Sequence, residues 1–423
     1  FALLSTFADK LETVKQVIVL SDDPVLPACP LPPAGEYEAL LAAASPDYDF
    51  PDFDENTRAT TFYTTGTTGQ PKGVYFSHRQ LVMHTMAAAT ALGTAAHQGR
   101  LHREDVYMPI TPMFHVHAWG LPYVSTLLGL KQVYPGRYQP DLLLKLVEQE
   151  KVTFSHCVPT ILHMLLNSPL SKQIDLRGWK VIIGGSALPQ AMAQAALALG
   201  IDVFTGYGMS ETCPILTLAH LDSEMLAAPA AEQARLRAKT GKPLPLVDLR
   251  IVDGEMADLP HDDKASGEVV VRCPWLTQGY LKAEEASEAL WEGGYLHTSD
   301  IGRIDPAGFV QITDRIKDVI KTGGEWISSL LLEDIIAQHP AVSEVAVIGV
   351  KDDKWGERPL ALVVVKADHQ VTPQALRHHV IHATESGEVT RYGILVQVRL
   401  VDAITRTSVG KVNKLQLRQQ YPQ

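Results

Sequence analysis

Cysteine is scarce in this chain of 423 residues, and its four cysteines lie far apart. No two of them form a Cys-x-x-Cys pair, which argues against a structural zinc site and favours a reducing compartment. They are Cys29, Cys157, Cys213 and Cys273. His115 and His117 have the spacing of two metal ligands, but no third ligand follows nearby. We therefore expect a cytoplasmic protein without a structural metal.

Long apolar runs and an excess of basic residues are also absent. No apolar run reaches the roughly 20 residues that a membrane-spanning helix needs. The net charge of −11 argues against a protein that binds nucleic acid through contacts to its phosphates. We expect no transmembrane segment and no nucleic-acid partner, and we leave a peripheral membrane contact and a homodimer open. Hydrophobic residues make up 46% of the chain, which is enough for a large core.

Residues 63–74 read YTTGTTGQPKGV and form the most informative pattern of the chain. Glycines allow backbone N–H groups to turn toward an anion, and threonine hydroxyls add further donors. Lys72 supplies a mobile positive charge. The pattern indicates a loop that binds a polyphosphate, although a flexible surface loop is the alternative for this string alone. It is not the common P-loop, because Pro71 stands where that motif has glycine.

This loop resembles the phosphate-binding signature of the adenylate-forming superfamily, which comprises acyl-CoA synthetases, luciferases and adenylation domains. The resemblance implies an enzyme that uses ATP to convert a carboxylate into an acyl-adenylate and then passes the acyl group to a thiol. It implies Thr65 as a catalytic and metal-binding residue. The phosphate-binding residues that it implies are Thr64, Thr65, Gly66, Thr67, Thr68, Gly69 and Lys72.

A second motif, GYGMSET, occupies residues 206–212. Tyr207 offers a flat face for a purine, and Glu211 offers a hard oxygen ligand for Mg²⁺. A tight turn with a buried tyrosine is the alternative for this motif alone. In the family this segment contacts the adenine and holds the metal, which makes Glu211 catalytic as well. The residues expected around adenine and ribose are Gly185, Ser186, Gly206, Tyr207, Gly208, Met209 and Thr212.

The third and fourth motifs lie further along the chain. GYLHTSD at 294–300 and DRIKD at 314–318 match the family's ribose-binding Asp and its assisting Arg at Asp300 and Arg315. The family usually has Gly before that Asp, and Ser299 here puts the local turn geometry in doubt. TSVGKVNK at 407–414 places Lys411 where the family has its catalytic lysine, whose ammonium stabilises charge at the α-phosphate. Taken alone, DRIKD and Lys411 would each be solvated surface charge.

Two further segments concern the substrate. KTGGEWISS at 321–329 resembles fatty acyl-CoA synthetases and implies a CoA channel at Gly323, Gly324 and Trp326. PMFHVHAWGLP at 112–122 fits the same branch and implies an acyl tunnel bordered by His115 and Trp119. Trp119 is a candidate gate for the tunnel, with simple core packing as an equal alternative. No aspartate that would hold the amine of an amino acid can be located, which favours a plain fatty or aryl acid.

Short apolar strands alternate with helical segments, which predicts a layered α/β fold with ligand loops at strand ends. Residues 180–183 and 202–205 read as strands, and Ser186 is the expected N-cap of the helix between them, which Gly200 ends. After residue 314 the pattern predicts a smaller unit. Its expected elements are a helix at 330–338, strands at 342–350 and 360–365, and a helix opening at Thr372.

Together with this change of pattern, the family resemblance implies a large domain at residues 1–313, a hinge at 314–319 with Lys317, and a small mobile α+β domain at 320–423. We expect the large domain to be incomplete at its N-terminus compared with the family, because only 62 residues precede the phosphate loop and no initiator Met is present. The expected activity is that of a medium- to long-chain fatty acid–CoA ligase using ATP, Mg²⁺ and coenzyme A. The alternatives are an aryl- or branched-acid CoA ligase, an acyl-AMP ligase, and a nucleotide-binding module without catalysis.

Overall fold

The computed structural model describes residues 1–21, 23, 25, 28–64, 71–323, 325–385, 391–407 and 411–422. By its internal contacts the chain divides into two units, Phe1–Asp54 and Glu55–Gln423. The first unit pairs two short parallel strands, β1 (Val17–Val19) and β2 (Pro33–Glu36). Its helices are α1 (Ala2–Ser5) and α2 (Tyr37–Ala43), and the carboxylate of Glu36 caps α2 by accepting from the N–H groups of Glu38 and Ala39.

A seven-stranded sheet forms the centre of the second unit. Its strand order is β11-β10-β9-β8-β7-β5-β6, and the run from β9 to β6 is parallel. Nearly every residue of β7 and β8 is buried, as expected for parallel strands covered on both faces. The strands are β5 (Val106–Pro109), β6 (Lys131–Gln132), β7 (Phe154–Cys157), β8 (Lys180–Ile183), β9 (Asp202–Gly208), β10 (Ile215–Leu218) and β11 (Lys242–Pro243).

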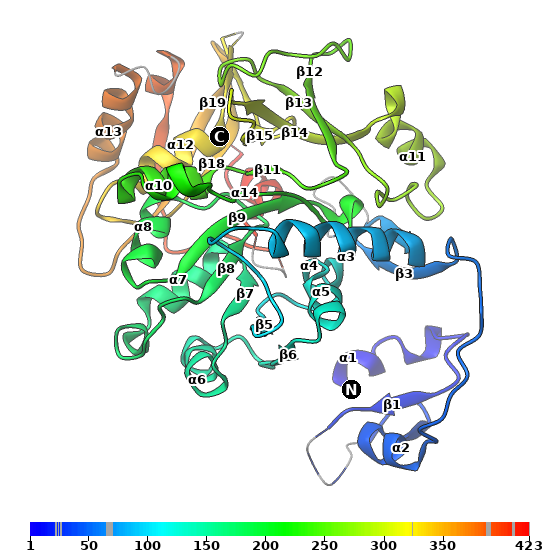
Figure 1. Cartoon of the computed structure of the whole chain (residues 1–423). Helices are drawn as coiled ribbons and strands as arrows, with labels where there is room; N and C mark the ends of the chain where they lie inside the picture. Colours follow the sequence, from blue (N-terminus) through cyan, green and yellow to red (C-terminus); the bar gives the residue numbers. More distant parts are fainter. Residues whose placement is uncertain are drawn as a thin grey trace. The chain divides into compact units, whose positions relative to one another are not determined.

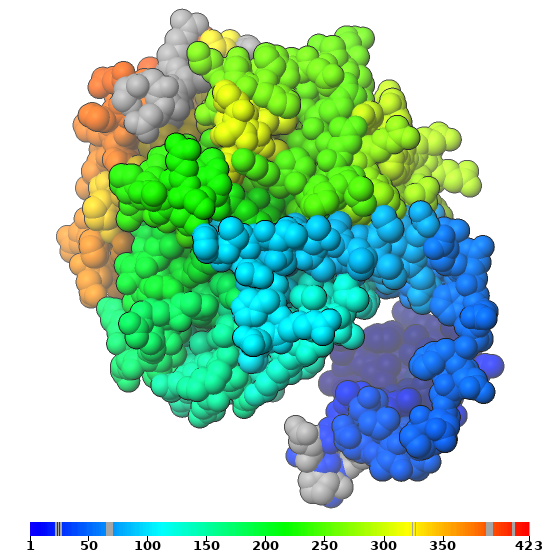
Figure 2. Space-filling view, viewed as in Figure 1, coloured from blue at the N-terminus to red at the C-terminus, as the bar shows by residue number. Residues whose placement is uncertain are grey.

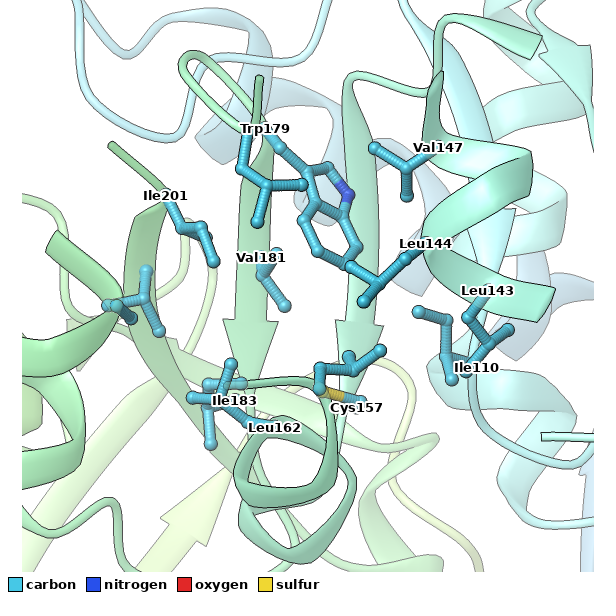
Figure 3. Packing of buried hydrophobic residues seen from close by; sticks show 14 of the residues in the cluster. Ile110, Leu143, Leu144, Val147, Cys157, Leu162, Trp179, Val181, Ile183 and Ile201 are labelled. Atoms are coloured by element: carbon cyan, nitrogen blue, oxygen red, sulfur yellow. The ribbon is translucent and has the colours of Figure 1, made fainter. Parts of the chain in front are cut away.

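Helices cover both faces of this sheet (Figure 1). Side chains alternate along β8, so Val181 and Ile183 join one core cluster and Ile182 joins the other. In the first cluster Trp179 lies among Leu144, Val147 and Val181 (Figure 3), and its indole N–H donates to Ser155 Oγ at 3.1 Å. That face carries α6 (Pro140–Glu150), α7 (Pro159–Asn167), α8 (Gln190–Ala198) and α10 (Ala230–Ala238), and the other carries α3 (His78–Gly93) and α5 (Leu121–Leu128).

Helix α3 follows an antiparallel pair of strands, β3 (Arg58–Tyr63) and β4 (Gly73–Ser77). It begins with a capping box, in which Ser77 Oγ accepts from the N–H of Gln80 and the Gln80 side chain accepts from the N–H of Ser77. Figure 2 shows α3 running across the surface of this unit. The segment between β3 and β4 is the predicted phosphate loop.

Two further sheets complete the unit. The first is antiparallel and consists of β12 (Asp248–Val252), β13 (Gly267–Arg272), β14 (Leu296–Ile304) and β15 (Val310–Arg315), with α11 (Glu284–Leu290) beside it. The second sheet has the strands β16 (Ile320–Thr322), β17 (Glu325–Ile327), β18 (Val342–Asp352), β19 (Gly356–Val365) and β20 (Gln397–Leu400). The helices of this part are α12 (Ser329–Ala337), α13 (Pro373–Glu385) and α14 (Lys414–Gln420). Short elements are α4 (Val116–Trp119) and α9 (Ser223–Leu226).

The predicted mixed α/β fold is confirmed, and one local prediction was wrong. Ser186 does not cap a helix, because α8 begins at Gln190 and has Pro189 as its N-cap. A proline disfavours helical geometry in the residue before it, so the helix cannot extend back through Leu188 toward Ser186. Strand β9 runs further than expected, to Gly208, because its end pairs with β10. Within the described residues, no helix combines the length and the apolar character that crossing a bilayer requires.

Candidate active site

The two ends of the predicted phosphate loop are held together in the structure. The N–H of Thr64 donates to the carbonyl of Lys72 at 2.9 Å, and the N–H of Lys72 approaches Thr64 Oγ1 at 3.3 Å. The ammonium of Lys72 lies 4.5 Å from the ring centroid of Tyr280. Thr65, Gly66, Thr67, Thr68 and Gly69 lie outside the described residues. The described ends thus bring the basic residue of the loop next to an aromatic ring of another segment.

The same aromatic residue contacts Glu211. The hydroxyl of Tyr280 donates to Glu211 Oε1 at 2.7 Å, and the Glu211 side chain is buried. Burial raises the pKa of Glu211, while the hydrogen bond from Tyr280 and the charges of Arg315 and Lys72 act in the opposite direction. Burial and Glu211 together raise the pKa of Tyr280. The site therefore holds a desolvated carboxylate that needs cations around it. Tyr280 was not predicted as a site residue, because a single tyrosine after Gly279 carries no distinguishing signal in the sequence.

Asp300 is the centre of a second group of contacts. Tyr207 donates from its hydroxyl to Asp300 Oδ2 at 2.7 Å, and Arg315 Nε lies 3.2 Å from Oδ1. The pairing of β14 with β15 places Asp300 directly opposite Arg315, which explains how residues from two motifs meet. Burial acts to lower the pKa of Arg315, but the charges of Asp300 and Asp318 have the larger combined effect, so the pKa of Arg315 is raised. These contacts suit a carboxylate that accepts hydrogen bonds from vicinal hydroxyls.

Glycines at the end of β9 allow neighbouring segments to approach closely. A Cβ at Gly208 would lie 1.8 Å from the carbonyl oxygen of Pro214, and one at Gly206 would lie 2.9 Å from Ile182. Met209 and Thr212 are joined by a hydrogen bond of 3.0 Å from the Met209 N–H to Thr212 Oγ1. Ligands of parallel α/β sheets bind at these carboxyl ends of the strands.

Lys411 reaches this region from the C-terminal part of the chain. Its Cε would lie 3.2 Å from a Cβ placed on Gly185, which has φ +81°. Burial lowers the pKa of Lys411 to about 8, Arg315 acts in the same direction, and Asp300 and Glu211 oppose the shift. The four predicted motifs therefore meet in space, although Thr64 and Lys411 are 347 positions apart in the sequence.

His115 lies near Lys411, and Trp119 lies against Gly184. Burial and the charge of Lys411 lower the pKa of His115 to about 4, so its ring is neutral near pH 7. Trp119 is 7% exposed, belongs to the core cluster of α3 and α5, and lies against Gly184, where a Cβ would meet its ring at 3.0 Å. Residues Val116–Trp119 all have positive φ, between +47° and +61°, which is a costly left-handed turn for side-chain-bearing residues. The gate role of Trp119 stays a prediction.

A buried polar pair lies behind Trp119. The ring centroids of Trp119 and His156 are 4.9 Å apart, and His156 Nε2 is 2.7 Å from the hydroxyl of Tyr107. Burial lowers the pKa of His156 to about 3, so the ring is neutral. Its Nδ1 has no hydrogen-bond partner among the residues that the structure describes. An orphaned nitrogen in an apolar cluster is costly unless something else pairs with it. No sequence motif marks this pair of residues.

The residues predicted for the CoA channel and the hinge lie within residues 317–326. Gly323 has φ +59°, its N–H donates to the carbonyl of Trp355 at 2.8 Å, and a Cβ there would meet Trp355 at 3.0 Å. Trp326 lies on β17 with its backbone paired to Lys321, whereas Gly324 lies outside the described residues. Partial desolvation of the ammonium and the charge of Arg315 lower the pKa of Lys317. The neighbouring Asp318 forms an ion pair of 2.7 Å with Arg418.

The residues present fit Mg²⁺ held jointly with phosphates. Among the described parts of the chain, no three His, Cys, Asp or Glu side chains gather as a metal cage. Mg²⁺ is commonly bound through only one or two carboxylates together with substrate phosphates. The buried carboxylate of Glu211, with Lys72 of the phosphate loop nearby, matches that arrangement.

Comparison with known proteins identifies the family of this chain. Residues 2–281 match the family model described as AMP-binding enzyme, and residues 331–411 match the AMP-binding enzyme C-terminal domain. The chain belongs to the AMP-binding enzyme family. The predicted superfamily and the class of acid–thiol ligases are thereby confirmed, and ATP and CoA are substrates in this family.

Similar proteins include several CoA ligases. The chain is 40% identical to a long-chain-fatty-acid–CoA ligase of Thermus thermophilus, covering 99% of this chain and 74% of that protein. It is 37% identical to a 3-methylmercaptopropionyl-CoA ligase of Ruegeria lacuscaerulensis, covering 99% and 76%. The crystal structure of ATP-bound MatB from Rhodopseudomonas palustris matches with a TM-score of 0.78 at 26% identity, covering 91% of this chain and 72% of MatB.

Proposed function

We propose that this AMP-binding enzyme is an ATP-dependent fatty acid–CoA ligase for medium- to long-chain acids. It converts a fatty acid and ATP into acyl-adenylate and pyrophosphate, and then converts the acyl-adenylate and CoA into acyl-CoA and AMP. The observation that carries the proposal is the convergence of Lys411 with Gly185, Asp300 and Glu211. The similarity to the Thermus thermophilus ligase supports the fatty acid as substrate.

In the first step a carboxylate oxygen of the acid bonds to the α-phosphorus, and the bond from that phosphorus to the bridging oxygen breaks. Pyrophosphate leaves with the electron pair, held by Thr64, Lys72 and the loop between them. Lys411 stabilises the charge that builds on the α-phosphate and the carboxylate. Tyr207 lies against the adenine, and Asp300 with Arg315 binds the ribose. The catalysis is mainly positioning and charge stabilisation.

We further propose that Glu211 and Thr65 are the protein's ligands for Mg²⁺. When bound, the cation neutralises charge on the phosphates. Glu211→Gln keeps the volume of the side chain and removes its charge, so we expect it to raise the Mg²⁺ concentration that half-maximal pyrophosphate release requires. An unchanged Mg²⁺ titration would remove Glu211 from the metal site.

The thioester step requires CoA to reach the same acyl-adenylate. We propose a large domain at 1–313, a hinge at 314–319 around Lys317 and a small domain at 320–423 that rotates between the two steps. Gly323, Gly324 and Trp326 would then border the CoA channel. We propose a cytoplasmic location. We also propose to test the purified protein for peripheral membrane contact and for homodimer formation.

The experiment that tests the function is a substrate panel. Purified protein is supplied with ATP, Mg²⁺ and CoA, and thioester and pyrophosphate are measured with dodecanoate and with benzoate. We expect both products with dodecanoate and little with benzoate. Thioester from benzoate alone would identify an aryl-acid ligase, and pyrophosphate without thioester would identify an acyl-AMP ligase.

A second candidate substrate class follows from His156. Its unpaired Nδ1 behind Trp119 favours a short acid that carries a heteroatom able to contact the ring. The similarity to a 3-methylmercaptopropionyl-CoA ligase points the same way. Comparing 3-methylmercaptopropionate with hexanoate tests this alternative. His156→Leu should reduce kcat/KM for the thioether acid and leave hexanoate unharmed if the contact exists.

A further inference from the structure

The ribose-binding candidate Asp300 follows a residue in left-handed conformation. Ser299 has φ +57°, a region that side-chain-bearing residues avoid and glycine adopts without cost. Asp300 itself is held by its N–H, which donates to Thr298 Oγ1 at 3.1 Å, and Thr298 donates to the carbonyl of Val269 at 2.6 Å. The direction of the Asp300 carboxylate therefore depends on whether the turn at Ser299 keeps its shape.

Both backbone polar groups of Ser299 have specific partners. Its N–H donates to Oε1 of Glu268, on the neighbouring strand β13, at 3.0 Å. Its carbonyl accepts from the N–H of Ile316 at 3.0 Å, and Ile316 directly follows Arg315. One strained residue thus links the strand that carries Asp300 to the segment that carries Arg315.

His297 holds Glu268 from the other side. His297 Nδ1 is 2.9 Å from Glu268 Oε2, and His297 Nε2 is 3.0 Å from the carbonyl oxygen of Glu292. Each ring nitrogen lies within hydrogen-bond distance of one oxygen, so the His297 ring is held from both sides. The side chains of His297 and Glu268 are only 18% and 19% exposed. With Oε2 occupied by His297, Oε1 is directed to the Ser299 N–H.

We propose that Glu268 and His297 are a positioning pair that maintains the left-handed turn at Ser299 and thereby orients Asp300 and Arg315 for the ribose of ATP. A glycine at this position would adopt the turn by itself. Because this chain has serine, for which the left-handed conformation is costly, the hydrogen bond from the Ser299 N–H to Glu268 is needed to hold the turn. The inference rests on the proposed nucleotide-binding function of Asp300.

A double-mutant cycle tests the pair, using Glu268→Ala, Ser299→Gly and both together. We expect Glu268→Ala to raise KM for ATP by about tenfold, since an N–H group loses its charged acceptor, with KM for the fatty acid nearly unchanged. Ser299→Gly in that background should restore KM for ATP to within about threefold of the parent. Glu268→Gln, which keeps an acceptor oxygen, should be milder than Glu268→Ala. Arg272→Ala, on the same strand, is the matched control and should leave KM for ATP unchanged.

ATP affinity measured by calorimetry without acid or CoA separates this proposal from the proposed reaction. If the parent protein binds ATP but forms no thioester, the reaction is wrong and the pair is still tested by the ATP affinity of the variants. If Glu268→Ala binds ATP like the parent, or if Ser299→Gly does not restore ATP affinity in the folded double variant, the positioning role is overturned. An equal fall in all kinetic parameters together with a lower melting temperature would also overturn it, because that pattern indicates a purely structural residue.

Discussion

The hydroxyl of Tyr280 lies 2.7 Å from Oε1 of Glu211 and donates a hydrogen bond to it. The ring of the same tyrosine lies 4.5 Å from the ammonium of Lys72. The next residue, Leu281, donates its N–H to the carbonyl of Gly73 at 2.8 Å, which fixes this segment to the strand that leaves the phosphate loop. One aromatic residue therefore supports both the cation that faces the phosphates and the proposed metal ligand.

Tyr280→Phe keeps the ring beside Lys72 and removes only the hydrogen bond to Glu211. A hydrogen bond to a charged group contributes about 1.5–3 kcal/mol, so we expect a loss of roughly 10- to 100-fold in kcat/KM for ATP. The measurement is pyrophosphate release at varied ATP and saturating fatty acid. Tyr75→Phe, on β4, is the matched control, since its ring stacks on Arg58 outside the site. Equal losses in the two variants would contradict the role of the Tyr280 hydroxyl.

The pH dependence of acyl-adenylate formation should follow Lys411. Its ammonium is the active form, and its pKa is lowered to about 8, so the rate should be level below that pH and fall above it. Pyrophosphate release without CoA, measured between about pH 6.5 and 9.5, would show this limb. Glu211 opposes the shift, so Glu211→Gln should move the falling limb to lower pH. A limb that moved upward would show that the two residues do not interact as the structure indicates.

Lys411→Ala should separate the two half-reactions. We expect acyl-adenylate formation to fall by about 100- to 1000-fold or more, because preorganised charge at the α-phosphate is lost. Thioester formation from supplied acyl-adenylate should be affected much less. Each half-reaction is measured separately on a variant whose folding is checked by its melting temperature. Equal losses in both half-reactions would show that the assigned step is wrong.

Trp119→Ala distinguishes a gate from a core residue. A gate predicts a changed fatty-acid length profile, since each methylene held in an apolar tunnel contributes about 0.8 kcal/mol. The burial of Trp119 against Gly184 and His156 predicts instead a loss of about 3–5 kcal/mol of stability. Melting temperature and length profile are measured on one preparation. A large loss of stability with an unchanged profile would eliminate the gate.

The sequence by itself determined the family, the mixed α/β fold and the identity of most candidate site residues. The motifs depend on local backbone chemistry, so the linear sequence alone shows them. They are the glycine and threonine spacing near Lys72 and the short motifs at Glu211, Asp300 and Lys411. Strand 180–183 was also predicted correctly, since its apolar residues are bounded by glycines. The prediction that Ser186 caps a helix was wrong, because Pro189 disfavours helical geometry in the residue before it.

Only the tertiary structure decided which side chains support those motifs. Tyr280 contacts Glu211 across 69 positions of sequence, and Glu268 contacts the N–H of Ser299 across 31. Such contacts depend on strand pairing and on the meeting of separate layers, which no local pattern encodes. The lowered pKa of Lys411 has the same origin, since desolvation and the nearby charge of Arg315 arise only when the chain has folded.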